Sequence, residues 1–164
     1  MKNILLSVFF LGAALNTSAS EIKEIFNRQQ PLTIEGVTIT PQKELLSLYS
    51  DGKLHTVGNR QYFLLINGYP SRQGNPTAQC GAGQEMYADI YQVEVKKVTR
   101  VQRIMVVSCW RSLELNSWQK QESFSSITWN KDGVTFDWIV PPNFTNLRAQ
   151  LNLNTASPEL IFIP

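Results

Sequence analysis

Histidine, cysteine and charged residues are all scarce in this chain, and each scarcity excludes a class of function. One histidine and two cysteines among 164 residues are too few for the common zinc sites. Fifteen basic residues against 13 acidic ones give a formal charge of +2, and the basic residues form no long run. Nucleic-acid binding requires a basic face that neutralises several phosphates. We therefore expect no metal, no cofactor and no nucleic-acid partner.

The sequence also lacks an apolar run long enough to cross a membrane as a helix. The longest run, residues 4–15, has about 12 residues where a transmembrane helix needs about 20. It follows Lys2 and precedes small residues at 16–20, the order that is typical of a secretory signal peptide. We therefore expect residues 1–20 to be cleaved, residues 21–164 to form a single β-rich domain, and the mature chain to be periplasmic or secreted.

Export changes the interpretation of the two cysteines, Cys80 and Cys109. In an oxidising compartment an isolated pair of thiols is expected to form a disulfide. Closing this loop stabilises the fold by roughly 3–4 kcal/mol in the chain-entropy model. The alternative, a catalytic or redox thiol, lacks both a Cys-x-x-Cys spacing and a nearby histidine.

One segment of the mature chain has helical character. Thr40 can cap a helix, Pro41 suits the first helical position, and leucines at 45, 46 and 48 are followed by Asp51-Gly52 as a stop signal. We expect a short helix near residues 41–50.

The remaining pattern has the period of two that is typical of strands. Residues 62–66 are apolar at every position, which predicts a central strand covered on both faces. Residues 32–39 fit a kinked strand or a small hairpin. Residues 86–95 and 101–110 fit two strands of a long hairpin, and a shift in apolar parity predicts a bulge near Tyr91-Gln92.

The C-terminal third carries the clearest strand signals. A hairpin is predicted over residues 127–138, because Gly133 in the turn allows the flanking apolar side chains to share one face. Alternation over 146–153 and the apolar residues 160–163 predict two further strands, and we interpret prolines 141–142 as a sheet corner. The resulting fold class is mainly β, with seven or eight strands in an antiparallel sheet curled as a small barrel or sandwich.

The longest irregular segment, residues 67–85, is the first candidate for recognition. Loops of this length are uncommon in compact domains and are usually functional or mobile. A loop tethered by the disulfide loses less entropy on binding, so we expect Tyr69 to act as an aromatic anchor, Arg72 as a planar donor and Glu85 as a counter-charge. The alternative is a glycine-rich connection that the disulfide only holds in place.

Four tryptophans have different expected roles. Trp129 and Trp138 lie on the apolar face of the predicted hairpin and are expected in the core, as is Trp110. Trp118 lies in a polar stretch between strands. It could be an exposed anchor for a sugar or a protein, or it could cover an end of the barrel.

No catalytic constellation stands out. His55 has Asp51 nearby in sequence, but a surface histidine is the simpler interpretation. Asp132 and Asp137 flank the predicted hairpin turn, where a turn aspartate has a structural role.

These observations favour an exported, non-enzymatic binding protein. We expect this chain to be an inhibitor or immunity protein. Its expected partner is an enzyme or toxin of the cell envelope, which it engages through the disulfide-tethered loop. Two alternatives are open: a carbohydrate-binding module that uses Trp118 and Tyr69, and a hydrolase whose paired carboxylates meet only in the fold.

Overall fold

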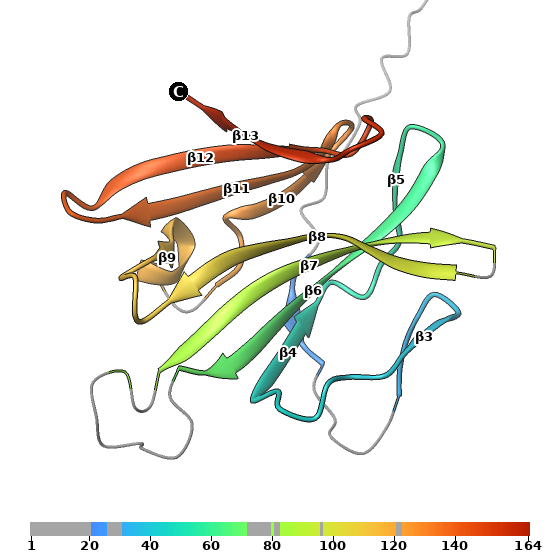
Figure 1. The fold of residues 1–164 in the computed structure, drawn as a ribbon, viewed down its shortest axis with the longest axis horizontal. Coiled ribbons are helices and arrows are strands. Elements are labelled where there is room, and N and C mark those ends of the chain that lie inside the picture. Colours follow the sequence, from blue (N-terminus) through green and yellow to red (C-terminus); the bar gives the residue numbers. More distant parts are fainter. Residues whose placement is uncertain (1–20, 26–30, 72–79, 81–82, 96, 121–122) are drawn as a thin grey trace, which may run out of the picture.

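A computed structural model shows an almost purely β protein in which two antiparallel sheets are layered face to face (Figure 1). The structure describes residues 21–25, 31–71, 80, 83–95, 97–120 and 123–164. The predicted signal peptide therefore lies outside the described residues. None of the helical structure in the described part is long and apolar enough to cross a membrane.

The first sheet is built around one long apolar strand. In order of pairing it runs β1-β4-β6-β7-β8, with β5 also paired to β6. Residues 62–66 of β6 are at most 3% exposed, which confirms the prediction of a central strand covered on both faces. The strands of this sheet are β1 (Lys23–Glu24), β4 (Ser47–Ser50), β5 (His55–Val57), β6 (Arg60–Pro70), β7 (Gln84–Glu94) and β8 (Lys97–Ser108).

The second sheet runs β10-β11-β12-β13, with the short β9 on the other side of β11. The β10–β11 turn confirms the predicted hairpin, because Ile127, Trp129, Val134, Phe136 and Trp138 all pack against the same core. Its strands are β9 (Glu114–Leu115), β10 (Ile127–Asn130), β11 (Gly133–Val140), β12 (Thr145–Asn152) and β13 (Glu159–Ile163), and a five-residue 3₁₀ helix, η1 (Asn116–Lys120), follows β9.

Gly133 is required where it stands in this hairpin. Its φ is +144°, and a Cβ atom there would lie 2.1 Å from the carbonyl oxygen of Leu151. Any other side chain would therefore force β11 and β12 apart.

Two hydrophobic cores lie on opposite faces of the first sheet. The larger one fills the space between the two sheets and includes Tyr62, Met86, Phe136 and Leu151. The smaller one contains Ile34, Leu45, Leu48, Phe63 and Leu65, under a separate hairpin of β2 (Leu32–Ile34) and β3 (Val37–Ile39). This hairpin covers part of the outer face of the first sheet and explains why β6 is apolar on both sides (Figure 1).

Three expectations about the fold are wrong. The described residues form 13 strands in three sheets, not seven or eight, and these do not close into a barrel. No helix forms near residues 41–50, where Ser47–Ser50 is a strand instead. So short an apolar run fits the period of a helix and that of a strand equally well. Pairing with the edge of β6 favours the strand, and the Leu46 N–H donates to the Gly68 carbonyl (2.8 Å). Residues 141–144 form a turn between the paired strands β11 and β12, not a corner.

The β7–β8 hairpin is irregular where a bulge was expected. Ile90 lies opposite Gln102, whereas the next residue, Tyr91, lies opposite Arg100. Val101 is therefore the extra residue. The bulge thus lies in β8, opposite Ile90 and Tyr91, and not in the strand over residues 86–95 where it was predicted, and it changes which residues of β8 share a face. A second register shift lies between Met86 and Tyr87.

Candidate functional site

The predicted disulfide between Cys80 and Cys109 is present. The two Cα atoms are 5.7 Å apart, and the bond joins residue 80, from the connection between β6 and β7, to the residue that follows β8. The disulfide thus crosslinks the connection to the neighbouring strand end. We call this part of the molecule, comprising Ser71, Cys80, Gly83–Glu85 and residues 108–112, the disulfide end.

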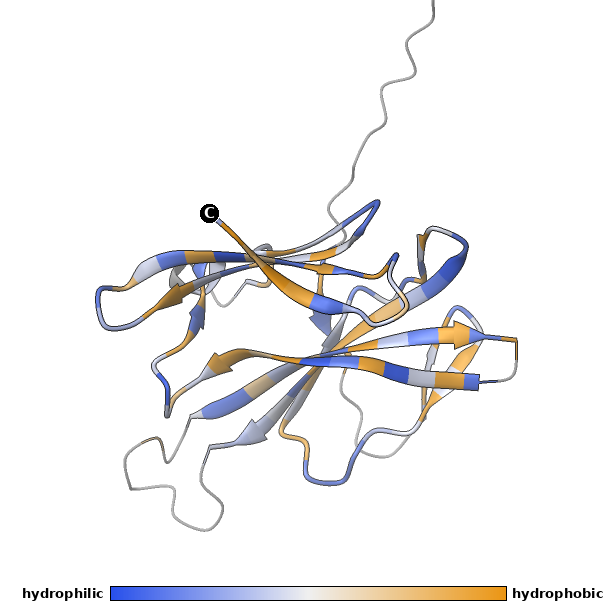
Figure 2. Cartoon of the chain, turned by 45° about the horizontal axis from the view of Figure 1, so that its top comes forward, coloured by the Kyte–Doolittle hydropathy of each residue, from blue (hydrophilic) through white to orange (hydrophobic). Residues whose placement is uncertain are grey.

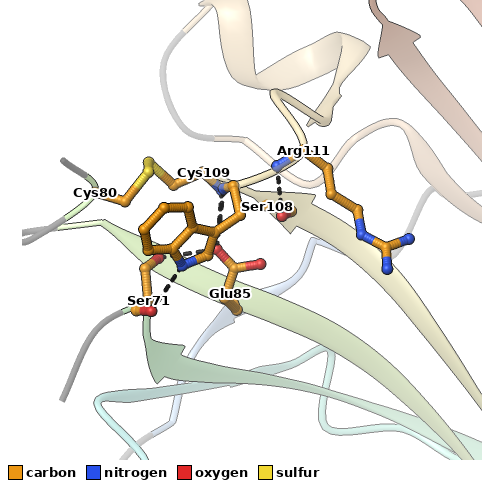
Figure 3. The surroundings of a disulfide bond; sticks show 7 residues. Ser71, Cys80, Glu85, Ser108, Cys109 and Arg111 are labelled. Carbon is orange, nitrogen blue, oxygen red and sulfur yellow. Dashed lines mark hydrogen bonds between the residues drawn. A yellow bond between two sulfur atoms is a disulfide. The ribbon is translucent and has the colours of Figure 1, made fainter.

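Glu85 organises the disulfide end from within (Figure 3). Its Oε1 accepts hydrogen bonds from the Ser71 hydroxyl (2.9 Å) and from the backbone N–H groups of Cys109 (3.0 Å) and Trp110 (3.4 Å). This oxygen is therefore used inside the protein, and the role of Glu85 as a counter-charge for a partner stays a prediction. One carboxylate ties both chain segments that the disulfide joins.

Trp110 is the residue that sequence analysis placed wrongly. Strand β8 ends at Ser108, so Trp110 lies in the following turn and is 48% exposed rather than in the core. Its indole N–H donates to the Ser71 carbonyl at 2.8 Å. A large aromatic side chain is thus held at the surface in a defined position, beside the disulfide.

A groove of about 580 Å³, bordered by Cys109, opens between residues of the first and the second sheet. Trp118 lines it together with residues of the disulfide end. Trp118 also packs on the larger core, 6.0 Å from Phe124 between ring centroids, and its indole N–H is buried with no acceptor among the described residues. The ring covers the end of the core and also forms a wall of the groove, and its role as an anchor for a sugar or a protein stays a prediction. The other lining residues include Gly83, Ser108, Cys109, Glu114 and Phe144.

Left-handed backbone conformations gather around this groove. Four non-glycine residues of the described chain have positive φ, and three of them are Cys80 (+59°), Ser112 (+49°) and Phe144 (+51°). Ser112 and Phe144 line the groove, and Cys80 is bonded to Cys109, which also lines it. Such conformations are unfavourable for bulky side chains and are often found at binding sites, where the surrounding structure holds them. Phe144 combines this unfavourable backbone conformation with a side chain that is 62% exposed.

Of the other two predicted contact residues, the structure describes one. Arg72 lies outside the described residues. Tyr69 is half-buried at the end of β6, where its hydroxyl donates to Gln42 Oε1 (2.6 Å) and accepts from Arg103 (3.3 Å). Its hydroxyl therefore serves the fold, and only part of its ring is available to a partner.

A buried carboxylate on β7 forms the centre of a second polar cluster. Asp89 is 1% exposed, and Arg103 donates to both of its oxygens at 2.7 Å. The Asn67 amide adds a hydrogen bond of 2.9 Å, and Arg100 Nη1 lies 3.6 Å away. In a regular strand Arg100 and Arg103 would point to opposite faces; the bulge at Val101 brings both to the same carboxylate.

Aromatic rings surround this cluster. The Arg103 guanidinium lies 5.3 Å from the centroid of the Tyr87 ring and 5.8 Å from that of Tyr69. The hydrogen bond to Asp89 raises the pKa of Arg103 above its ordinary value. Burial, and then the charge of Asp89, raise the pKa of Tyr91. The guanidinium therefore stays charged, and the tyrosine is favoured in its neutral form.

The residues considered for acid–base chemistry have structural partners. His55 lies 2.6 Å from Asp51 and stacks on Trp129 at 4.1 Å between centroids, so it links β5 to β10 across the two sheets. Asp137 is ion-paired with Arg148. Asp132 accepts a hydrogen bond from the Asn154 amide (3.1 Å).

Comparisons with known proteins provide no relative from which a role could be transferred. No protein-family model, curated protein or solved structure matches this chain. The function must therefore be inferred from the residues of the site.

Proposed function

We propose that this chain is an exported, non-enzymatic binding protein whose disulfide end engages a protein partner in the cell envelope. An inhibitor or immunity protein that occupies a cleft of an enzyme or toxin fits such a surface. The observation that carries the proposal is Trp110, half exposed yet fixed by hydrogen bonds beside a crosslink. Tryptophan is among the residues that contribute most to protein interfaces.

Preorganisation supports this role. Ordering a flexible side chain costs about 0.5–1.5 kcal/mol on binding, and the indole bond of Trp110 to the Ser71 carbonyl meets part of that cost in the free protein. The adjoining groove, with the exposed ring of Phe144 at its wall, would let a partner insert a side chain next to the tryptophan.

Site-specific photo-crosslinking in an exporting cell tests the proposal. A photoreactive amino acid at position 110 is expected to form a discrete adduct with one envelope protein, whereas the same group at Val95, fully exposed on the β7–β8 turn, is not. With the captured partner, Trp110→Ala should weaken binding by about 30-fold, the loss expected for a tryptophan hot spot, and Val95→Ala should not. Identical adducts from both positions, or none from position 110, would contradict the proposal.

The groove favours a glycan as the second candidate ligand. It combines Trp118 and Phe144 with polar side chains such as Gln84, Ser108 and Glu114, a mixture that suits sugar rings and their hydroxyls. Titration with soluble peptidoglycan fragments, followed by tryptophan fluorescence, distinguishes the candidates: a saturable change that Phe144→Ala reduces and Trp110→Ala leaves intact supports the glycan.

A further inference from the structure

Strand β13 is the outer strand of the second sheet, and among the described residues no strand pairs with its other edge. Its five residues are Glu-Leu-Ile-Phe-Ile, between Pro158 and Pro164. Natural edge strands are usually protected by lysine, by an internal proline or by a bulge. The charged residue of β13 is Glu159 at its start, and residues 160–163 are apolar and pair with β12 without a bulge (Figure 2).

In the cross-strand rows that extend to β13, the outward face of the second sheet is polar until β13 is reached. Thr135 and Gln150 lie in the same cross-strand row as Ile161, and Asp137 and Arg148 lie in the row of Ile163. Ile161 is nevertheless 56% exposed and Ile163 40% exposed. Isoleucine at the ends of polar rows is the pattern of a surface that is covered by something else.

The inward side chains of β13 border an apolar groove. Phe162, 60% exposed, and Leu160 line an opening of about 340 Å³ between β13 and β8, together with Ile104, Met105 and Trp138. A strand added beside β13 would place its own inward side chains along this opening. The side chains on both faces of β13 therefore favour an additional strand paired along its edge over a partner that packs on one face of the sheet.

We propose that the occupant is β13 of a second copy of this chain, paired antiparallel about a two-fold axis through Ile161. This inference is independent of the partner proposed for the disulfide end. Such pairing joins two second sheets into one continuous sheet and satisfies the outer backbone groups of both edges.

The sequence of β13 is complementary to itself in this register. Ile161 lies opposite Ile161, Leu160 opposite Phe162, and Glu159 opposite Ile163 of the other copy, so all five residues pair. Glu159 then meets the apolar side chain of Ile163, so that no two like charges lie opposite each other. Sliding the strands until they centre on Glu159 would instead set two carboxylates against each other, and the flanking prolines, which lack an N–H, limit longer pairings.

The contact is small. A stable protein interface buries roughly 1,200–2,000 Å², more than two five-residue strands are expected to provide alone. We therefore expect a concentration-dependent equilibrium between monomer and dimer.

Sedimentation equilibrium of the oxidised protein, over a concentration series reaching millimolar, tests both the dimer and its register. Ile161→Lys sets two lysines directly opposite each other and should weaken association at least about tenfold. Ile163→Lys sets each lysine opposite Glu159 of the other copy, so its association should stay within about threefold of the original. Val95→Lys, on the distant β7–β8 turn, controls for the added charge, and circular dichroism verifies that each variant is folded.

Each outcome decides the proposal. Association that Ile161→Lys abolishes and Ile163→Lys preserves supports the two-fold pairing at β13. A monomer at every concentration overturns it, as does association that Ile161→Lys leaves intact. An equal loss of association in both lysine variants overturns the register and indicates that an apolar patch associates without strand pairing.

Discussion

The two sheets carry cross-strand Asp–Arg pairs of the same form in different surroundings. Asp89 lies opposite Arg103 on β7 and β8, and Asp137 lies opposite Arg148 on β11 and β12; in each pair Nε and Nη2 reach the two carboxylate oxygens. The aspartate side chain is 1% exposed in the first pair and 26% in the second. The direct cross-strand pairing is the same, so the surroundings distinguish the two pairs: Asp89 is buried and has Asn67 and Arg100 as further partners.

This difference reflects how the sheets are covered. The first sheet has a core on each face, and its polar groups must find partners inside the protein. The second sheet packs with one face only, and its outer polar groups can bind water. The same chemical pair is therefore a structural requirement in one sheet and close to neutral in the other.

The largest difference between the two sheets is expected when a phenylalanine of each is replaced by alanine. Phe63 is fully buried in β6 and stacks on Tyr91 at 4.9 Å, so Phe63→Ala should lower the free energy of unfolding by about 3–5 kcal/mol. Phe162→Ala, at the edge of the second sheet, should change it by less than about 0.5 kcal/mol. Urea unfolding at low micromolar concentration measures both, and a comparable loss at Phe162 would mean that β13 is packed in the monomer.

Removing the disulfide should have the next largest effect. The Cys80→Ser, Cys109→Ser double variant is expected to lose about 3–4 kcal/mol, because the crosslink no longer restricts the unfolded chain. Amides in the core of both sheets, which exchange by global unfolding, should accelerate by the factor that this loss implies, and residues 108–113 should accelerate also through local opening. Unchanged exchange in the core would show that the crosslink orders only the disulfide end.

The buried ion pair should matter more than the exposed one. Asp89→Ala leaves the half-buried Arg103 unpaired and should cost about 3 kcal/mol, whereas Asp137→Ala should leave the urea midpoint nearly unchanged. Replacing Arg103 by Met in the Asp89→Ala variant should restore part of the lost free energy of unfolding, because it removes the unpaired charge. Equal costs for the two aspartates would refute the role assigned to burial.

The smallest effect tests the anchoring of Trp110. Trp110→Phe removes the indole bond to Ser71 and should cost about 1 kcal/mol or less. The variant also identifies the Trp110 indole signal in an NMR spectrum by its disappearance. In the original protein that N–H should exchange with water more slowly than a free indole; exchange at the free rate would mean that Trp110 is not held.

Local patterns were sufficient for much of the β structure. The hairpin around Gly133, the alternation in β12 and the apolar centre of β6 were predictable because each depends on a side-chain period or a turn residue within a short segment. The pairing of Cys80 with Cys109 followed from there being two cysteines. The segment before Ser50 was predicted wrongly because its leucines fit both periods, and contact with a distant strand decided between them.

The proposed binding surface was less predictable. Tyr69, Glu85 and Trp118 were named from composition, yet Glu85 is committed to backbone N–H groups from residues 109 and 110, and Trp110 was assigned to the core. A strand that ends two residues earlier than its apolar pattern suggests was enough to move this tryptophan to the surface. The convergence of Arg100 and Arg103 likewise depends on one extra residue in β8.

The sequence by itself determined that this chain is β-rich, which residues alternate toward a core, and which cysteines bond, because these properties depend on side-chain type and on neighbours along the chain. Only the tertiary structure decided which sheet is covered on both faces, where β8 ends, which carboxylates are buried and which edge is left open. Those outcomes depend on contacts between segments far apart in sequence, whose free energies no local pattern contains.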